Sequence, residues 1–442
     1  MDLKLTPIAA CIGITLVSFM ACPAADKPAD KTSDQWFQWR GPNRDGKSPD
    51  TGLLKSWPEG GPKQLWKLSG IGQGFSSVSF GGGLIYVTGR KEKGNPARLP
   101  EAPHVYKRPG ERFYVFAIDM QGKFKWARDL TRAYLGFYKG TRGTVTYDNG
   151  NIYVETGVGE ILCCDAQSGK TKWTRDIHKD FKGITPEGHT FGRSESVLII
   201  GEMLIATPGG EDAFMVALDK KTGKTVWKSP RISAAAHSSP IYVVYKGVPI
   251  IINGAHMGLV CIHAKTGKIQ WVRKFAEGAR GRVSTPCFVG GYVYWAVGYG
   301  KGGICMKMSA SGQKVKAKEA WRSDDMDCIV GGHIIHDGYI YGNHKKGYSC
   351  LELKTGKTMW KTESEGVGGK GSICWADGML YLYAEKDGQT ALATCSPKGL
   401  EIKGSVSVAG TNQSWAHPVV FGGRLYLRYD DNLYCFDVKS RQ

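Results

Sequence analysis

The sequence predicts an all-β fold, an eight-bladed β-propeller whose ring is closed by its own N-terminal segment. Three observations carry this prediction. A short sequence motif, in which a turn glycine is followed by a tryptophan, recurs along the chain. Short hairpin patterns precede most copies of this motif. One tryptophan-bearing strand, at Trp66, lies near the N-terminus with no blade in front of it.

The recurring motif predicts where each blade ends. Its clearest copies are 117–126, 163–173, 217–227, 261–271 and 350–360. A looser copy ends at Trp321, and a faded copy covers 393–403 without its tryptophan. The repeat tryptophans are Trp126, Trp173, Trp227, Trp271, Trp321 and Trp360. They recur every 39 to 54 residues, which is the period of one four-stranded propeller blade.

The hairpin patterns supply the other three strands of each blade. In residues 288–294, two short apolar runs flank a Gly-Gly turn, and similar patterns precede most tryptophan strands. The last unit, 414–438, has three strands and no fourth, while 64–68 has the character of a fourth strand. We therefore expect Trp66 to complete the last blade and close a ring of eight, which removes exposed sheet edges.

The N-terminal residues predict export. Lys4 precedes an apolar run, 8–21, that is too short to span a membrane. We expect 1–25 to be a signal peptide, 26–60 to be a tether with a motif, and 61–442 to be a single propeller domain. The protein is then periplasmic, associated with the outer membrane or extracellular. Lipidation of Cys22 is an alternative that would tether the chain to a membrane.

The amino-acid composition limits the classes of partner that we expect. The net charge of +19 predicts affinity for anions, or simply a soluble basic surface. No signature of DNA or RNA binding is present, so nucleic acid is not an expected partner, and we expect a monomer. Among the twelve cysteines, Cys163, Cys261, Cys350 and Cys435 occupy a repeat slot that elsewhere holds alanine. This alternation predicts small buried residues in separate blades rather than disulfides.

The repeat resembles the tryptophan-docking repeat of the pyrroloquinoline quinone (PQQ) dehydrogenase superfamily over everything after residue 60. The motifs at 36–46 (WFQWRGPNRDG), 51–54 (TGLL), 194–196 (SES) and 298–303 (GYGKGG) resemble bacterial secreted PQQ-like propeller proteins. A more distant similarity is to the outer-membrane lipoprotein that scaffolds barrel assembly. That relative implies eight blades and no cofactor.

Alignment of the units places polar residues before the innermost strands, where they would ring one mouth of the central channel. The candidate ligand-binding residues are Arg142, Arg193, Glu195, His237, Arg282, Lys370, Trp415 and His417. A positive funnel attracts polyanions and carboxylates. The alternative is that these side chains turn outward or pair with Glu195 and nearby loop acids.

The resemblance also implies an alternative activity, a PQQ- and calcium-dependent dehydrogenase of an alcohol or sugar. Relatives that use PQQ hold calcium with Glu, Asn and Asp, and this set has no counterpart that we place here. The Cys163-Cys164 pair lies in the repeat slot, and the acidic cluster 324–327 predicts a solvated loop. His333 and His336 point to opposite faces of a strand. We assign no catalytic or metal-binding residue and expect no cofactor, with PQQ and calcium as the alternative.

Together these observations predict an exported, non-catalytic binding or scaffolding module of the cell envelope. Its basic funnel would engage an anionic envelope polymer or a protein partner. We expect this binding to weaken with salt and to be lost when Arg142, Arg193 and Arg282 are replaced together by alanine.

Overall fold

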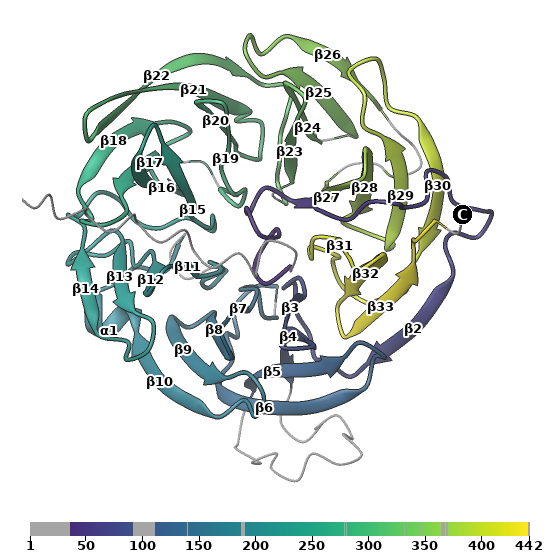
Figure 1. Cartoon of the computed structure of the whole chain (residues 1–442), viewed down its shortest axis with the longest axis horizontal. Coiled ribbons are helices and arrows are strands. Elements are labelled where there is room, and N and C mark those ends of the chain that lie inside the picture. Colours follow the sequence, from purple (N-terminus) through teal and green to yellow (C-terminus); the bar gives the residue numbers. More distant parts are fainter. Residues whose placement is uncertain are drawn as a thin grey trace, which may run out of the picture.

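The computed structural model is an eight-bladed β-propeller, which confirms the predicted fold class (Figure 1). The structure describes residues 36–91, 111–138, 140–186, 191–277, 279, 281–330, 332–344, 346–363, 367 and 370–440. Within these ranges, none of the helical segments has the length and apolar character needed to cross a membrane. The predicted signal peptide, Cys22 and most of the loop 90–112 lie outside the described residues.

Four blades form the first half of the ring. Blade 1 contains β3 (Ser79–Gly81), β4 (Leu84–Lys91), β5 (Arg112–Asp119) and β6 (Phe124–Arg132). Blade 2 contains β7 (Thr146–Asp148), β8 (Asn151–Glu155), β9 (Glu160–Asp165) and β10 (Thr171–Asp176), followed by the short helix α1 (Ile177–Phe181). Blade 3 contains β11 (Leu198–Ile200), β12 (Met203–Ala206), β13 (Val216–Asp219) and β14 (Thr225–Lys228). Blade 4 contains β15 (Ile241–Tyr245), β16 (Val248–Ala255), β17 (Gly258–His263) and β18 (Ile269–Lys274).

The second half repeats this order. Blade 5 contains β19 (Cys287–Val289), β20 (Tyr292–Ala296), β21 (Gly303–Ser311) and β22 (Lys314–Ser323). Blade 6 contains β23 (His333–His336), β24 (Tyr339–Asn343), β25 (Tyr348–Glu352) and β26 (Thr358–Lys361). Blade 7 contains β27 (Gly371–Ala376), β28 (Met379–Ala384), β29 (Gln389–Thr394) and β30 (Ile402–Ser407). Blade 8 contains β31 (Val419–Phe421), β32 (Arg424–Tyr429), β33 (Asn432–Asp437) and the N-terminal strand β2 (Gln64–Ser69).

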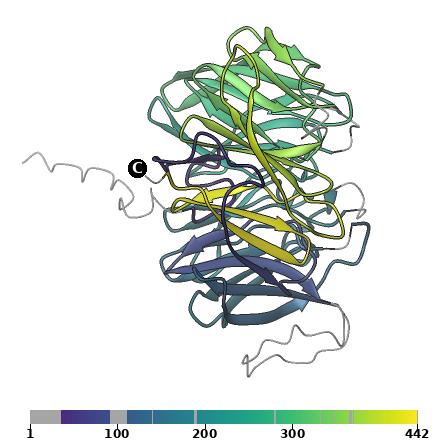
Figure 2. The same ribbon diagram turned by 90° about the vertical axis from the view of Figure 1, so that its right-hand side faces the viewer.

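Ring closure follows the predicted scheme. Strand β2 pairs antiparallel with β33, and the register places Trp66 opposite Cys435. The innermost strand of each blade therefore lies near the axis and the tryptophan strand lies at the rim (Figures 1 and 2). Because the first and last segments of the chain share one sheet, no blade is left with an open flank at the junction.

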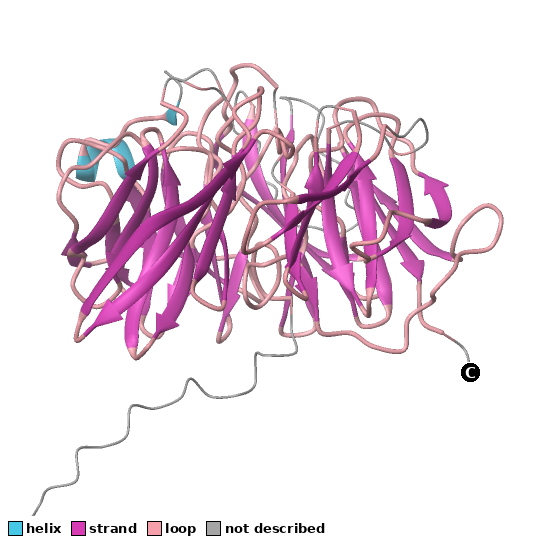
Figure 3. Cartoon of the chain, turned by 90° about the horizontal axis from the view of Figure 1, so that it is seen from above, coloured by secondary structure: helices cyan, strands magenta, loops and turns pink. Residues whose placement is uncertain are grey.

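The antiparallel order gives the ring two distinct faces. On the mouth face each innermost strand begins and each second strand connects to the third. On the turn face lie the first-to-second and third-to-fourth turns. Helix α1 lies at the upper edge in Figure 3, on the mouth face, and the C-terminus lies at the lower edge, on the turn face. The two faces carry different side chains.

Tryptophan docking joins most neighbouring blades. The indole Nε1 of Trp66, Trp126, Trp173, Trp227, Trp321 and Trp360 each donates to a backbone carbonyl in the next blade's turn, at 2.8–3.2 Å. Except at Trp360, the ring lies over the turn glycine of the next blade, so a Cβ on Gly267 would approach Trp227 to 2.6 Å. Trp271 differs, because its buried Nε1 has no partner among the described residues. Blade 5 explains the exception, since β21 and β22 form a longer hairpin there.

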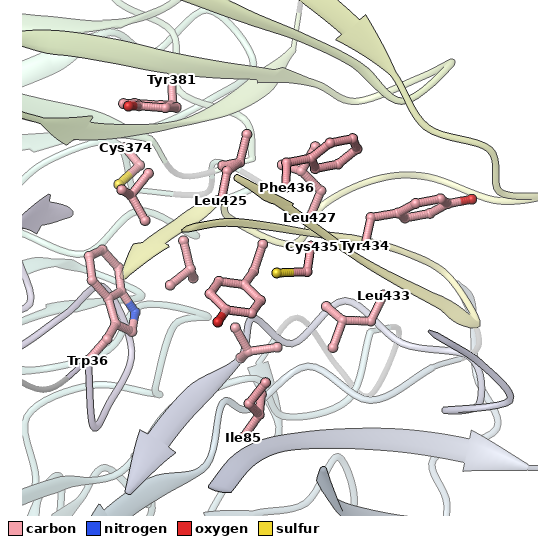
Figure 4. Packing of buried hydrophobic residues seen from close by; sticks show 14 of the residues in the cluster. Trp36, Ile85, Cys374, Tyr381, Leu425, Leu427, Leu433, Tyr434, Cys435 and Phe436 are labelled. Atoms are coloured by element: carbon pink, nitrogen blue, oxygen red, sulfur yellow. The ribbon is translucent and has the colours of Figure 1, made fainter. Parts of the chain in front are cut away.

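The core lies between blades and holds the repeat cysteines. Figure 4 shows Trp36 and Ile85 packed with Cys374, Tyr381 and the blade 8 residues that include Cys435. All ten cysteines in the described ranges are free thiols. Cys163, Cys261, Cys350 and Cys435 are buried at 0–1% exposure, as the alternation with alanine predicts.

The described part of the motif segment packs inside the ring rather than along its surface. Strand β1 (Lys47–Ser48) pairs parallel with β27, and the residues before it fill the turn-face end of the channel. The segment contacts the blades in turn through Phe80, Tyr147, Val197, Pro240, Thr285, His333, Trp375 and His417. We call residues 36–48 the plug. It contacts all eight blades and closes one end of the channel.

Candidate functional site

A pocket of about 180 Å³ opens at the mouth face of the central channel. Six aromatic side chains line it, namely Trp39, Phe75, Tyr138, Phe191, Tyr299 and Trp415. Of the eight residues predicted to bind a ligand, it includes Arg142, His237, Lys370 and Trp415. Small-molecule sites in proteins span roughly 300–1,000 Å³, so this pocket accommodates a single ring or one side chain.

The plug forms the floor of this pocket. Trp39 donates from Nε1 to Thr285 Oγ1 at 2.9 Å, and its ring meets the buried His417 edge to face at 4.5 Å. Both partners lie at the beginnings of innermost strands, so they fix the indole on the channel axis. The channel is therefore blind from the mouth face, and its base is an aromatic surface.

Two buried arginines hold the plug in place. Arg40 donates to the carbonyl oxygens of Asp45 at 3.0 Å and His333 at 2.5 Å. Arg44 donates to Gln38 Oε1 at 2.9 Å and to the carbonyls of Pro240 at 2.8 Å and Val197 at 2.5 Å. Burial lowers the pKa of Arg44 to about 9, so it stays charged at neutral pH. Guanidinium groups satisfy several carbonyls at once, which suits a plug that crosses many strand ends.

The pocket wall is a cluster of interlocked rings. Trp415 lies with its ring centroid 4.8 Å from that of Phe75 and 4.7 Å from that of Tyr138. Its Nε1 donates to Glu385 Oε1 at 2.8 Å. Phe191 continues the wall from Tyr138, at 6.0 Å between centroids. Offset and tilted ring contacts of this kind stabilise one another, so the wall presents a preformed apolar surface.

Arg142 combines a structural role with a place in the pocket. Its guanidinium lies over the rings of Phe75 and Tyr134, at 5.5 and 5.4 Å from their centroids. It also donates to the carbonyl oxygens of residues 137, 138 and 140, at 2.7–3.1 Å, and so orders the loop that carries Tyr138. Burial lowers its pKa to about 10, which leaves a cation at neutral pH. Arg142 therefore places a positive charge beside the aromatic wall.

His237 offers a neutral polar group to the pocket. Its Nδ1 lies 2.8 Å from Ser194 Oγ, and its buried Nε2 has no partner among the described residues. Burial, with a smaller contribution from the nearby cations of Arg142, Arg193 and Arg282, lowers its pKa to about 3. A ring with so low a pKa is a weak base at neutral pH, so the pair lacks the features of an activated serine. It is a hydrogen-bonding group for a ligand instead.

The other predicted residues lie outside the pocket, buried in the surrounding wall. Arg193 donates from Nε to Glu155 Oε1 at 2.5 Å and also contacts the carbonyls of Ile184 and Thr207. Arg282 is 1% exposed and donates to the carbonyl of Ala276 at 2.8 Å. The expected alternative was that such side chains turn outward or pair with Glu195 and loop acids. These two arginines instead turn inward, Arg193 to Glu155 and Arg282 to a backbone carbonyl. Their charges still act on His237 through the low-dielectric wall.

Glu195 and His417 have structural neighbours too. Glu195 Oε1 accepts from Thr207 N at 3.0 Å, and burial next to Glu155 raises its pKa, while Arg193 and Arg44 oppose that shift. The motif at 194–196 thus lies beside the plug motif, a proximity that the linear sequence does not reveal. His417 lies under Trp39, and burial lowers its pKa well below the usual value.

The pocket residues do not fit a calcium-bound quinone. Glu385 is the one carboxylate among the described lining residues, and its Oε1 already accepts from Trp415. Across the described ranges, no three His, Cys, Asp or Glu side chains come together as a metal site. Cys163 and Cys164 lie in the third strand of blade 2, and Asp325 pairs with Lys361 at 2.8 Å. The calcium ligands that such a cofactor needs are therefore not gathered here.

Sequence reasoning did not place several pocket residues in the site. Trp39 was identified only as part of a motif, Tyr138 lies in a loop, and Glu385 lies in a connection between strands. The repeat alignment could not place these residues, because loops vary in length between blades and have no equivalent positions in the repeat. The motif at 36–46 did carry a usable clue, because its two tryptophans and two arginines are costly to expose in a simple tether.

Comparisons with known proteins agree with this architecture. A sequence family described as "Outer membrane protein assembly factor BamB" matches residues 111–362, more than half of the chain. The assembly factor of that name from Moranella endobia is 25% identical over 264 residues, which cover 57% of this chain and 63% of the relative. A quinoprotein ethanol dehydrogenase from Pseudomonas aeruginosa is 29% identical over 33% of this chain and 25% of the relative. The chain thus spans less than two thirds of the length of these relatives.

Solved structures share the fold at low identity. BamB from Moraxella catarrhalis superposes with a TM-score of 0.58 at 14% identity, covering 86% of this chain and 98% of that one. Quinohemoprotein alcohol dehydrogenase from Comamonas testosteroni superposes with a TM-score of 0.61 at 12% identity, covering 93% and 81%. These likenesses concern the fold alone. On the sequence match and the eight-bladed ring, the chain belongs to the PQQ-like propeller family described as outer membrane protein assembly factor BamB.

Proposed function

We propose that this protein is an exported, non-catalytic binding module of the cell envelope whose mouth-face pocket holds one anionic ring of a larger ligand. Membership of the BamB-described family supports an envelope location. The composition of the pocket carries the proposal. Its lining places the flat apolar faces of Trp39 and Trp415 beside the cations of Arg142 and Lys370. Flat aromatic surfaces next to cations favour planar or ring-shaped groups that carry a negative charge.

The ligand class follows from size and charge. A volume of about 180 Å³ admits one sugar unit or one side chain, so the remainder of the ligand lies outside the channel. An acidic sugar unit of an envelope polymer supplies both a ring face and a carboxylate. The neutral His237 adds a hydrogen-bonding group at the wall. This combination selects a charged ring over a neutral one by its contact with the cations.

The test uses Lys370, which lines the pocket and whose ammonium group makes no ion pair with the described residues. Oligogalacturonate is titrated against the exported protein while tryptophan fluorescence is followed, with maltotriose as the uncharged comparison. We expect Lys370→Met to weaken oligogalacturonate binding by about tenfold, the effect of one charge-assisted contact of roughly 1.4 kcal/mol. Lys386→Met, on an exposed loop of the same face, is the matched control and should bind normally.

The same preparation discriminates the dehydrogenase alternative. Titration with PQQ and calcium is followed by heat and by cofactor absorbance. Stoichiometric, calcium-dependent binding of PQQ would contradict our proposal and favour a quinoprotein dehydrogenase. Equal affinity for oligogalacturonate and maltotriose would show that the pocket does not select a charged ring, which would contradict the proposal. The triple arginine variant is unsuitable here, because loss of Arg193 leaves Glu155 buried without its ion pair.

A further inference from the structure

The turn face carries a cluster of exposed lysines on three consecutive blades. We call it the lysine arc, and it consists of Lys246, Lys265, Lys268, Lys314, Lys354 and Lys357. Lys246 lies in a first-to-second turn of blade 4, and the others lie in or beside the third-to-fourth turns of blades 4 to 6. Within the described part of the chain, no ion pair engages any of the six.

The neighbouring acids do not neutralise this arc. In blades 1 and 3 the third-to-fourth turn begins with Asp119 or Asp219, whereas blade 4 has His263 at that position. In blade 6, Glu352 accepts a hydrogen bond from Thr355 and so turns back into its own turn. Asp337, on the adjacent turn, lies 3.4 Å from His336, but burial lowers the pKa of that histidine, so Asp337 keeps its negative charge and, with Glu352, stands against six lysines. The arc therefore presents more positive than negative charge to a partner on this face.

An exposed apolar pair lies beside the lysines. Ser239 in blade 4 and Ser196 in blade 3 occupy equivalent positions. Counted from these serines, strand β15 is two residues longer than strand β11 before it reaches its turn. On this longer strand Tyr242 and Val244 share one face and are 40% and 58% exposed. Tyrosine and valine exposed next to lysines form a surface with both a charged and an apolar component.

The chain enters the ring from the same face. The carbonyl of Trp36 accepts from Phe80 N at 2.9 Å, and that of Phe37 accepts from Tyr147 N at 2.8 Å, at the turn-face ends of β3 and β7. The 35 residues before Trp36 therefore join the propeller at the face that carries the lysine arc. They include Cys22, so a lipid attached there would hold the arc toward a membrane.

We propose that the lysine arc, with Tyr242 and Val244, docks the propeller onto a membrane surface rich in anionic phospholipids. Clusters of four to eight basic residues bind such surfaces, and each lysine near the surface strengthens binding severalfold. The eight blades make the turn face broad, and consecutive blades bring the six lysines to one side of it. Tyr242 and Val244 add shallow contact with the headgroup region, which electrostatics alone does not provide. Docking would leave the mouth-face pocket facing away from the membrane.

The test is co-sedimentation of the exported protein, carrying Cys22→Ser so that no attached lipid contributes, with vesicles of phosphatidylcholine and phosphatidylglycerol at 3:1. We expect binding to these vesicles, loss of it on pure phosphatidylcholine, and steep weakening between low and high salt. The variant Lys268→Gln, Lys314→Gln, Lys357→Gln should bind about 100-fold more weakly.

The matched control removes the same charge from the opposite face. Lys179→Gln, Lys301→Gln, Lys386→Gln changes three exposed lysines on the mouth face and should bind within about twofold of the parent. Equal loss in both triple variants would overturn the proposal, because net charge rather than the arc would then be responsible.

A soluble polyanion separates a membrane from a polymer as the partner. Tyr242→Ser, Val244→Ser should weaken vesicle binding about tenfold and leave binding to dextran sulfate unchanged. Tight binding to dextran sulfate without binding to the vesicles would assign the arc to an anionic polymer and overturn membrane docking. This result is independent of the pocket, whose ligand is tested with Lys370→Met.

Discussion

Buried histidines line the plug and its surroundings, and each is held neutral by its environment. Burial lowers the pKa of His237 and of His333 to about 3, and that of His417 falls well below its usual value. Arg40 adds to this effect at His333 and His417, since a nearby cation disfavours a second one. These side chains are therefore neutral at neutral pH and make the folded protein sensitive to acid.

The histidines predict loss of stability at acidic pH. The unfolded chain binds these protons near pH 6.5. The folded chain binds those of His237 and His333 only near pH 3, and that of His417 also well below pH 6.5, so stability falls as pH drops through this window. Each histidine contributes up to roughly 1.4 kcal/mol per pH unit. The raised pKa values of the buried carboxyls Glu195, Glu155 and Asp45 oppose part of this effect. Urea unfolding at pH 7, 5.5 and 4.5 measures the slope.

A single replacement isolates the effect. His333→Leu removes one titrating group, and we expect the pH slope of the unfolding free energy to decrease by about 1.4 kcal/mol per pH unit between pH 6 and 4. An unchanged slope would mean that His333 is already charged in the folded protein or that acidification acts through carboxylates alone.

At the scale of elements, the third-to-fourth turn is the joint between neighbouring blades. The indole of one blade packs on the turn glycine of the next and donates to a nearby carbonyl, as Trp227 does to Ala264 at 3.0 Å. The glycine has a positive φ, 71° at Gly223 and 70° at Gly267, so it serves both the turn and the approach of the ring. Trp271 is buried at 9% exposure, but its ring does not lie on the turn glycine of blade 5, Gly312, and its Nε1 lacks a hydrogen bond among the described residues.

This difference gives a matched pair of variants. Trp227→Phe should cost about 1 kcal/mol more free energy of unfolding than Trp271→Phe, because only the first loses a hydrogen bond. Trp227→Ala should cost about 3–5 kcal/mol, the range for emptying a large aromatic site. Urea unfolding of the variants measures both. Equal costs for the two phenylalanine variants would show that the indole nitrogen contributes little to blade docking.

At the scale of the whole molecule, the N-terminal segment fastens the ring twice. Strand β2 completes blade 8 at the rim, and the plug contacts all eight blades at the axis. Both connections join residues far apart in the chain, so their formation removes much conformational freedom. The ring is therefore held as one unit, with a sealed axis on the turn face and a blind pocket on the mouth face.

A disulfide across the closure tests this connection. Ser69 and Asn432 lie opposite each other, with Ser69 Oγ donating to Asn432 Oδ1 at 2.7 Å. We expect Ser69→Cys with Asn432→Cys to raise the free energy of unfolding by about 4 kcal/mol when oxidised, since the bridge closes a very long loop. Thermal unfolding with and without dithiothreitol measures the gain, and Ser69→Cys alone is the control. No gain on oxidation would mean that the ring does not open at this joint on unfolding.

The sequence alone determined the eight blades, the closing strand and the packing of the repeat cysteines, because these depend on local periodicity that repeats along the chain. It also marked Arg142, His237, Lys370 and Trp415 as neighbours at one mouth. Only the tertiary structure decided that Arg193 and Arg282 turn into the wall, where buried acceptors satisfy them. The plug, the aromatic floor of Trp39 and the lysine arc likewise arise from contacts between distant segments, and no sequence period encodes such contacts.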